Sequence, residues 1–162
     1  MSRFIVSPYS PEWPKLFEAI REELLLAFSP TVVAIEHIGS TSVPGLAAKP
    51  VIDVVLGAQS LAVIESRIKP LGDLGYAYVS KYEDEFPMRR YFVKSAAGSL
   101  RIHVHGVEQG SRIWQEHLAF RDRLRADDDL RMRYQALKVQ LAEEFADDKA
   151  AYTSAKGPFI QS

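Results

Sequence analysis

The most constraining feature of this sequence is a twelve-residue stretch, 39–50, that separates two β-branched segments. The flanking segments, 31–38 and 51–56, have the composition of buried strands. The stretch between them contains Gly39, Pro44, Gly45 and Pro50. Glycine and proline at this density interrupt regular structure and favour turns. The pattern therefore predicts a strand, an ordered loop and a second strand.

Hydrophobic periodicity predicts the other elements of an α+β domain. An amphipathic helix is expected over residues 10–28, with Ser10 as its N-cap and Pro11 at its first helical position. A second helix is expected over 61–71. Alternating or β-branched segments predict three further strands, at 76–80, 90–94 and 100–104. The last two should pair through a short turn at 96–99 that contains Gly98.

From residue 113 onward the pattern is helical. Apolar spacing predicts three helices, at 114–124, 130–145 and 152–159. An acidic run at 127–129 fits a break before the second helix, because carboxylates favour a helix N-terminus. No repeat or linker interrupts the chain, so we expect one domain over 1–162. It would have an α/β core over about 1–108 and a helical tail over about 109–162 that packs on a mixed β-sheet.

Composition limits the classes of partner. Apolar residues make up 47% of the 162 residues and charged residues 25%, which is typical of a globular protein that folds alone. Twenty basic and 21 acidic side chains give a net charge of −1, and this balance argues against a nucleic-acid-binding surface. An anion site, if present, must be local.

The absence of cysteine and of a long apolar run predicts the cellular location of the protein. Without cysteine there are no disulfides or thiolate ligands, which suits a reducing cytoplasm and leaves histidine and carboxylate as metal ligands. No stretch approaches the ~20 apolar residues that a membrane-spanning helix needs. We therefore expect a cytoplasmic protein without a membrane partner.

Asp53 is unusual because it interrupts the apolar strand 51–56. A carboxylate in a buried strand is costly unless it is paired, hydrogen-bonded or bound to metal. Two interpretations follow with about equal weight. Asp53 holds a divalent metal, Mg²⁺ or Mn²⁺ with Zn²⁺ as an open alternative, or its carboxylate fixes N–H groups of the loop over 39–49.

The Gly39-Ser40 pair ends the first predicted strand, where small residues let backbone N–H groups and hydroxyls approach an anion. Phosphate is the natural guest, and Thr41, Ser42 and Lys49 are candidates for further contacts. A P-loop is excluded, because no glycine-lysine-serine/threonine ending is present and a strand follows the loop. The alternative to a phosphate site is a structural turn in which the serine and threonine hydroxyls form hydrogen bonds with their own backbone.

Arg101, His103 and His105 alternate with apolar residues, so on a strand all three point to one face. The two histidines suit a shared metal ion, and with Arg101 they suit a phosphate. Arg90 on the neighbouring strand would add a positive charge. A solvated sheet face is the alternative.

Other polar residues carry weaker signals. His37 and His117 are more typical of hydrogen-bond networks than of metal sites. Arg121, Lys138 and Lys156 in the helical tail are candidates to lean over the pocket, although long basic side chains usually cover surface.

The run from His37 to Asp53, His-Ile-Gly-Ser-Thr-Ser-Val-Pro-Gly-Leu-Ala-Ala-Lys-Pro-Val-Ile-Asp, resembles the signature of the GrpB-like family. Further matching motifs lie along nearly the whole chain, at 89–90, 103–105, 114–125, 134–138 and 152–156. The resemblance implies a nucleotidyltransferase-like fold, in which the loop serine contacts a triphosphate and strand aspartates hold metal. It also implies an association with coenzyme A metabolism, because relatives of this domain occur joined to dephospho-CoA kinase.

The sequence departs from the nucleotidyltransferase pattern where metal would be held. The second strand carboxylate of that superfamily corresponds to Val55 here, and the third to the Arg101, His103 and His105 face. Because a two-metal mechanism needs several carboxylates, we expect at most one metal ion. The leading hypothesis is a protein that binds a nucleotide or phosphorylated metabolite and transfers a nucleotidyl group, with Asp53 on metal and Arg101 or Lys49 on the transferring phosphate. A non-catalytic sensor or accessory domain with the same pocket is the alternative, and a purely structural interaction domain ranks last.

Overall fold

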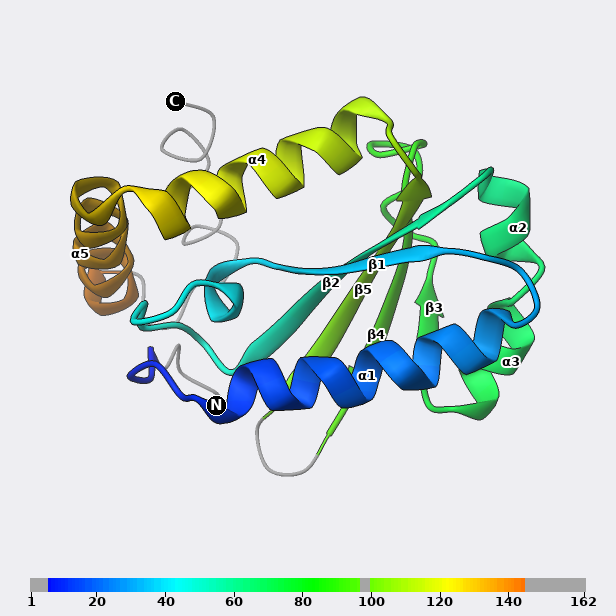
Figure 1. The fold of residues 1–162 in the computed structure, drawn as a ribbon, viewed down its shortest axis with the longest axis horizontal. Helices are drawn as coiled ribbons and strands as arrows, with labels where there is room; N and C mark the ends of the chain where they lie inside the picture. Colours follow the sequence, from blue (N-terminus) through cyan, green and yellow to red (C-terminus); the bar gives the residue numbers. More distant parts are fainter. Residues whose placement is uncertain (1–5, 97–99, 145–162) are drawn as a thin grey trace.

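The computed structural model describes residues 6–96 and 100–144. Figure 1 shows the course of the chain. Its elements in order are α1 (Glu12–Phe28), β1 (Ala34–Ile38), the 3₁₀ turn η1 (Ser40–Ser42), β2 (Val51–Ala58), α2 (Leu61–Glu65), α3 (Ile68–Asp73), β3 (Ala77–Val79), β4 (Arg90–Ser95), β5 (Arg101–Glu108), α4 (Arg112–Ala126) and α5 (Asp128–Glu144).

The five strands form one mixed sheet in the order β1-β2-β5-β4-β3. β2 and β5 are parallel, whereas the other three neighbouring pairs are antiparallel. The predicted pairing of the strands at 90–94 and 100–104 is confirmed. The α+β class with a mixed sheet and flanking helices is confirmed as well.

The two faces of the sheet differ in how they are covered. The inward face of β2, with Ile52, Val54 and Leu56, packs with Phe17 and Leu24 of α1 in the main core. The opposite face is covered in part by α4, whose Trp114 packs on Ile38, Val55 and Val107. Figure 1 shows α1 and α4 on either side of β1. Polar residues on the α4 side therefore lie where the sheet is only partly covered.

A second apolar cluster joins the helical tail to the loop between β1 and β2. Val43 and Leu46 of the loop are fully buried against Leu124 of α4 and Leu130 and Tyr134 of α5. The loop thus has its own small core. This contact explains why a segment rich in glycine and proline holds one course.

The predicted helix at 61–71 is wrong in one respect, because it is divided into α2 and α3 near Arg67. Pro70 explains the break, since proline has no N–H to give to the carbonyl four residues earlier and its ring clashes with that turn. Elsewhere only boundaries shift. β1 begins at Ala34, and β2 and β5 extend to Ala58 and Glu108.

The predicted break before the last described helix is confirmed. Asp127 lies between α4 and α5, and its Oδ1 accepts a hydrogen bond from the backbone N–H of Leu130 at 3.0 Å. The helix predicted at 152–159 and residues 97–99 of the predicted turn lie outside the described residues, as does Lys156. Within the described ranges, no helix has the length and apolar content to cross a bilayer.

We expect Leu124→Ala to lower the free energy of unfolding by about 2–5 kcal/mol, because it leaves a cavity between loop, α4 and α5. Met132→Ala on α5 is the control, since Met132 is 69% exposed and should change stability by less than about 0.5 kcal/mol. Urea denaturation measures both. Equal stability of the two variants would contradict a packed loop.

Candidate functional site

Asp53, His103 and His105 meet on the face of the sheet that α4 partly covers. Asp53 of β2 is the register partner of His103 in β5. Asp53 Oδ1 lies 3.7 Å from His103 Nδ1 and 3.2 Å from His105 Nε2. Alternation along β5 places Ile102 and Val104 in the main core and the histidines on the other face, as the sequence predicted. The Asp53 side chain is 27% exposed, so the carboxylate is less buried than its apolar neighbours suggested.

The imidazole of His105 is held on both sides. Its Nδ1 lies 3.3 Å from Arg89 Nη1, and its Nε2 lies 3.2 Å from Asp53 Oδ1. Since arginine can only donate, Nδ1 accepts and the Nε2–H donates to the carboxylate. The ring therefore orients the carboxylate of Asp53.

Tyr91 and His117 complete the walls around the histidines. The Tyr91 ring centroid lies 5.6 Å from that of His103 and 5.1 Å from that of His105. The His117 ring of α4 lies 5.6 Å from His105, tilted by 41°. Burial, aided by the Asp53 charge, raises the pKa of Tyr91 to about 12. Burial, aided by neighbouring His105, lowers the pKa of His117 to about 4. Both side chains are therefore neutral near pH 7.

Gly39 touches the Asp53 carboxylate. It has φ +73°, and a Cβ added there would lie 2.6 Å from Asp53 Oδ2. Two reasons therefore require glycine at position 39: the positive φ, and the lack of space for a side chain beside Asp53. The chain leaves β1 directly over the carboxylate of β2.

Thr41 and Ser42 use their hydroxyls within the loop. Ser42 Oγ donates to the Gly39 carbonyl at 2.5 Å, and Thr41 Oγ1 donates to the Val51 carbonyl at 2.8 Å. Thr41 must then accept from His37 Nε2–H, 2.9 Å away. Burial lowers the pKa of His37 to about 4, and its ring stacks on Phe17 at 4.9 Å. These contacts agree with the network role proposed for His37.

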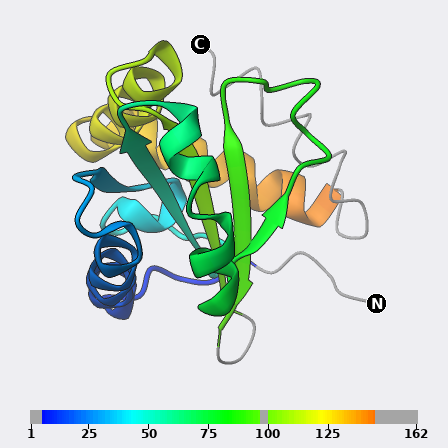
Figure 2. The same cartoon turned by 90° about the vertical axis from the view of Figure 1, so that its right-hand side faces the viewer.

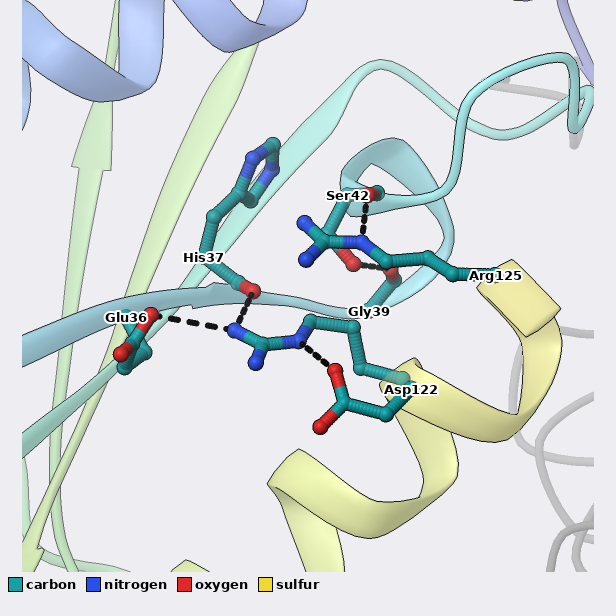
Figure 3. Close-up of polar contacts among 7 residues, drawn as sticks. Glu36, His37, Gly39, Ser42, Asp122 and Arg125 are labelled. Carbon is teal, nitrogen blue, oxygen red and sulfur yellow. Dashed lines mark hydrogen bonds and ion pairs between the residues drawn. The ribbon is translucent and has the colours of Figure 1, made fainter.

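Two arginines of α4 hold the backbone at the start of the loop, as Figure 3 shows. Arg121 Nη1 donates to Glu36 Oε2 at 3.1 Å and to the His37 carbonyl at 3.2 Å. Arg125 Nε donates to the Ser42 carbonyl at 3.0 Å. Both arginines position the loop, and Arg121 also donates from Nε to Asp122 Oδ1 of its own helix at 2.9 Å.

α5 holds the end of the same loop. Gln135 Oε1 accepts from the Ala47 N–H at 3.0 Å, and Lys138 Nζ donates to the Ala47 carbonyl at 2.8 Å. Lys138 is only 2% exposed and lies over the Tyr134 ring at 5.5 Å. A buried ammonium group is thus fixed beside the loop.

A pocket opens between this loop and the sheet. It is lined by residues of the loop, β2, β5 and α5: Ser40, Thr41, Ala48, Lys49, Val51, Asp53, His103 and Lys138. The pocket brings together Ser40, Thr41, Lys49, Asp53 and His103, which the sequence singled out. Lys138, a weaker candidate from the helical tail, also lines it. Two lysines, one carboxylate and an imidazole share its lining.

Two predicted residues lie elsewhere. Arg90 is on the opposite face of the sheet, 3.6 Å from Glu65 Oε1 and 3.8 Å from Glu83 Oε1. The expectation that it adds charge beside His103 is wrong, because strand alternation turns it away. Arg101 is on the correct face but exposed at the start of β5, with Nη1 3.5 Å from Ser95 Oγ.

Sequence reasoning missed Arg89 and Tyr91 as neighbours of Asp53. Their face depends on the register of β4 against β5, which no short motif encodes. Lys138 is among the sequence candidates, and its position supports that choice, because it falls four residues after Tyr134 on the apolar stripe of its helix. A charged side chain on the apolar face of a helix indicates that a buried partner or a ligand lies close to it.

The described residues include no cluster of three or more histidine, aspartate or glutamate side chains arranged to hold a metal. Asp53 and the histidines provide one carboxylate and imidazole nitrogens. This donor set suits a single ion that draws further ligands from phosphate or water.

Comparison with known proteins identifies the family, because the GrpB protein family matches residues 3–162. The chain belongs to the GrpB family. Curated relatives include glutamate-rich protein GrpB of Alkalihalophilus pseudofirmus, 31% identical over 96% of this chain and 91% of that protein. UPF0157 protein YqkA of Bacillus subtilis is 38% identical over 95% of this chain, which spans 44% of that protein's length. A dephospho-CoA kinase of Mycolicibacterium paratuberculosis is 31% identical over 95% of this chain, which spans 43% of it.

Solved structures show which folds this chain resembles. The conserved protein GrpB from Enterococcus faecalis matches with a TM-score of 0.86 and 31% identity, over 97% of this chain and 95% of that one. The Cid1 poly(U) polymerase bound to MgGTP matches with a TM-score of 0.57 and 17% identity, over 84% of this chain and 44% of that one. The nucleotidyltransferase-like fold is therefore confirmed, and this likeness concerns the fold alone.

Gly39→Ala should destabilise the protein more than Gly45→Ala does. Both glycines have positive φ, but an added Cβ meets Asp53 at position 39 and has open space at position 45. Gly45→Ala measures the backbone cost of a positive φ, about 1–2 kcal/mol. The excess at position 39 reports the clash with Asp53 together with the glycine-specific ψ of −177° there. Chemical denaturation of both variants measures this difference, and equal losses would contradict the close approach.

His37→Gln should flatten the dependence of stability on pH. The native pKa of His37, about 4, lies below its ordinary value of 6.5. Between these values the unfolded chain binds a proton that the native protein does not, so stability is full above pH 6.5 and falls toward pH 4. The loss due to His37 is at most about 3 kcal/mol. Urea unfolding at pH 7 and pH 4.5 tests this, and parallel profiles of wild type and variant would refute it.

Proposed function

We propose that this GrpB-family protein binds the phosphate groups of a nucleotide or another phosphorylated metabolite in the pocket between its loop and β2. The observation that carries the proposal is the pocket lining. Ser40 and Lys49 come from the two ends of the loop and Lys138 comes from α5, and all three line one small space with Asp53 and His103.

The chemistry of the lining favours phosphate. Lysine ammonium groups are common phosphate ligands, and a serine hydroxyl can donate to a phosphate oxygen. Lys138 is buried and tied to the Ala47 carbonyl, so little side-chain entropy is lost when it meets an anion. Thr41 and Ser42 shape the loop through their hydroxyls, and Ser40 is the hydroxyl we assign to the ligand.

Asp53 and His103 are the residues that would hold a divalent metal. Asp53 Oδ1 and His103 Nδ1 lie 3.7 Å apart, a separation that one ion could bridge after a small adjustment. His105 is the third candidate, but Arg89 and Asp53 already use its two nitrogens. The ion would neutralise charge on a bound phosphate, and Mn²⁺ or Zn²⁺ suits imidazole better than Mg²⁺ does.

Nucleotidyl transfer is the second candidate function, and the fold favours it. Because the site has one carboxylate, one ion and Lys49 would have to stabilise the negative charge on the transferring phosphate. A sensor or accessory domain would bind the ligand without catalysis. This alternative is favoured by the buried apolar Val55, which stands where a second metal-binding carboxylate would be needed. Turnover of a nucleotide by the purified protein distinguishes the two.

The similarity to dephospho-CoA kinase suggests the class of ligand. That protein's name denotes a substrate with both phosphate and adenine, and this chain is similar to 43% of its length. We extend the proposal to ligands of coenzyme A metabolism, acting in the cytoplasm.

Calorimetric titration of ATP, with and without Mn²⁺, tests the metal role. We expect Mn²⁺ to strengthen ATP binding to the wild type and to have no effect on Asp53→Asn. Asp73→Asn is the matched control, because Asp73 is exposed at the end of α3. An equal Mn²⁺ effect in Asp53→Asn would exclude Asp53 as a ligand.

Tripolyphosphate binding tests the phosphate role separately. Lys49→Met should weaken it at least tenfold, the loss of one charge-assisted contact of about 1.5–3 kcal/mol. Lys15→Met should leave it unchanged, because that lysine is 74% exposed on α1. Wild-type protein that binds neither ATP nor tripolyphosphate would overturn the proposed function.

A further inference from the structure

An exposed aromatic surface lies beside the pocket, on the segment that connects β3 to β4. Tyr82 is 39% exposed and Phe86 is 41% exposed. Large aromatic side chains normally bury most of their surface. Figure 2 shows this segment, in green, extending from the sheet beside β4.

The segment has a defined structure. Phe86 N–H donates to the Tyr82 carbonyl at 2.8 Å, and Arg89 N–H donates to the Phe86 carbonyl at 3.1 Å. Glu83 pairs with Arg90 of β4 and accepts a hydrogen bond from Tyr78 Oη of β3. The two rings are therefore presented by an anchored loop.

A chain of ring contacts connects this surface to the pocket. Tyr82 and Tyr91 have centroids 6.2 Å apart, and Tyr91 lies 5.6 Å from His103, which lines the pocket. The guanidinium of Arg89 lies over Phe86 at 4.9 Å and over Tyr91 at 4.7 Å. We call Tyr82, Phe86, Arg89 and Tyr91 the ring platform.

The distance between platform and pocket suits one ligand. Asp53 is on β2, His103 on β5 and Tyr91 on β4, which are consecutive strands of the sheet. Neighbouring strands lie about 4.8 Å apart, and Tyr91 pairs with His105, two residues along β5 from the partner of Asp53. The platform therefore begins about 12 Å from Asp53. A nucleoside triphosphate spans a comparable length between its terminal phosphate and its base.

We infer that the ring platform stacks the aromatic ring of the ligand whose phosphates occupy the pocket. This inference rests on the proposed function and narrows it, because it selects nucleotides over sugar phosphates and inorganic polyphosphates. Every base has a π-face, so stacking gives affinity for nucleotides without strong preference among bases. Lys81 lies over the Tyr82 ring, and Arg89 lies over the rings of Phe86 and Tyr91. Tyr82 and Phe86 remain 39% and 41% exposed, so part of each ring is open to a ligand.

Titration of ATP and tripolyphosphate against the same variants tests the platform. Tyr82→Leu and Phe86→Leu keep an apolar side chain but remove the ring. We expect each to weaken ATP binding about fivefold to a hundredfold, the usual range for a lost base–aromatic stack. Tripolyphosphate binding should stay at the wild-type value, which also shows that the variants are folded. Met88→Leu is the control, since Met88 is 45% exposed on the same segment and carries no ring.

The outcomes separate this inference from the proposed function. Unchanged ATP binding in both ring variants, or equal wild-type affinity for ATP and tripolyphosphate, overturns the platform and leaves the phosphate pocket standing. Wild-type protein that binds neither probe overturns both. Loss of ATP binding with intact tripolyphosphate binding, and similar affinities for ATP and UTP in the wild type, supports a stacking platform.

Discussion

The close approach of Gly39 to Asp53 is the constraint on which the site depends. The chain leaves β1 with a left-handed residue that has no room for a side chain, and it passes directly over a carboxylate of the neighbouring strand. From that point the loop must turn back across the end of the sheet to reach β2. The pocket is the space that this course encloses.

The loop keeps its course because the helical tail holds it. Arg121 and Arg125 of α4 bind its first carbonyls, while Gln135 and Lys138 of α5 bind Ala47. Val43 and Leu46 add an apolar anchor between the two helices. The tail therefore belongs to the site, since it positions the loop and supplies a buried lysine to the pocket.

The site differs in charge from the carboxylate clusters of two-metal enzymes. Val55 lies under Trp114 in an apolar cluster, and the register partner of Asp53 is His103. Two lysines line the pocket beside a single carboxylate, so its lining is less acidic than the carboxylate cluster of a two-metal site. The fold is nucleotidyltransferase-like, whereas the pocket holds more basic side chains than a two-metal site does.

The sequence by itself determined the local features of this protein. The spacing of apolar residues fixed the helices and strands, the alternation of Arg101, His103 and His105 fixed their common face, and the run at 37–53 revealed the family. These are short-range patterns, because helix and strand periods are set by neighbouring residues. Pro70 also carried a break that the periodicity concealed.

Only the tertiary structure decided which polar residues meet. Arg90 points away from Asp53 while Arg89 and Tyr91 approach it, a choice made by the register of β4 on β5. Lys138 reaches the pocket because α5 packs on Leu46 and its neighbours, far away in sequence. Register and helix docking depend on the summed packing of the whole core, so no local motif could fix these contacts.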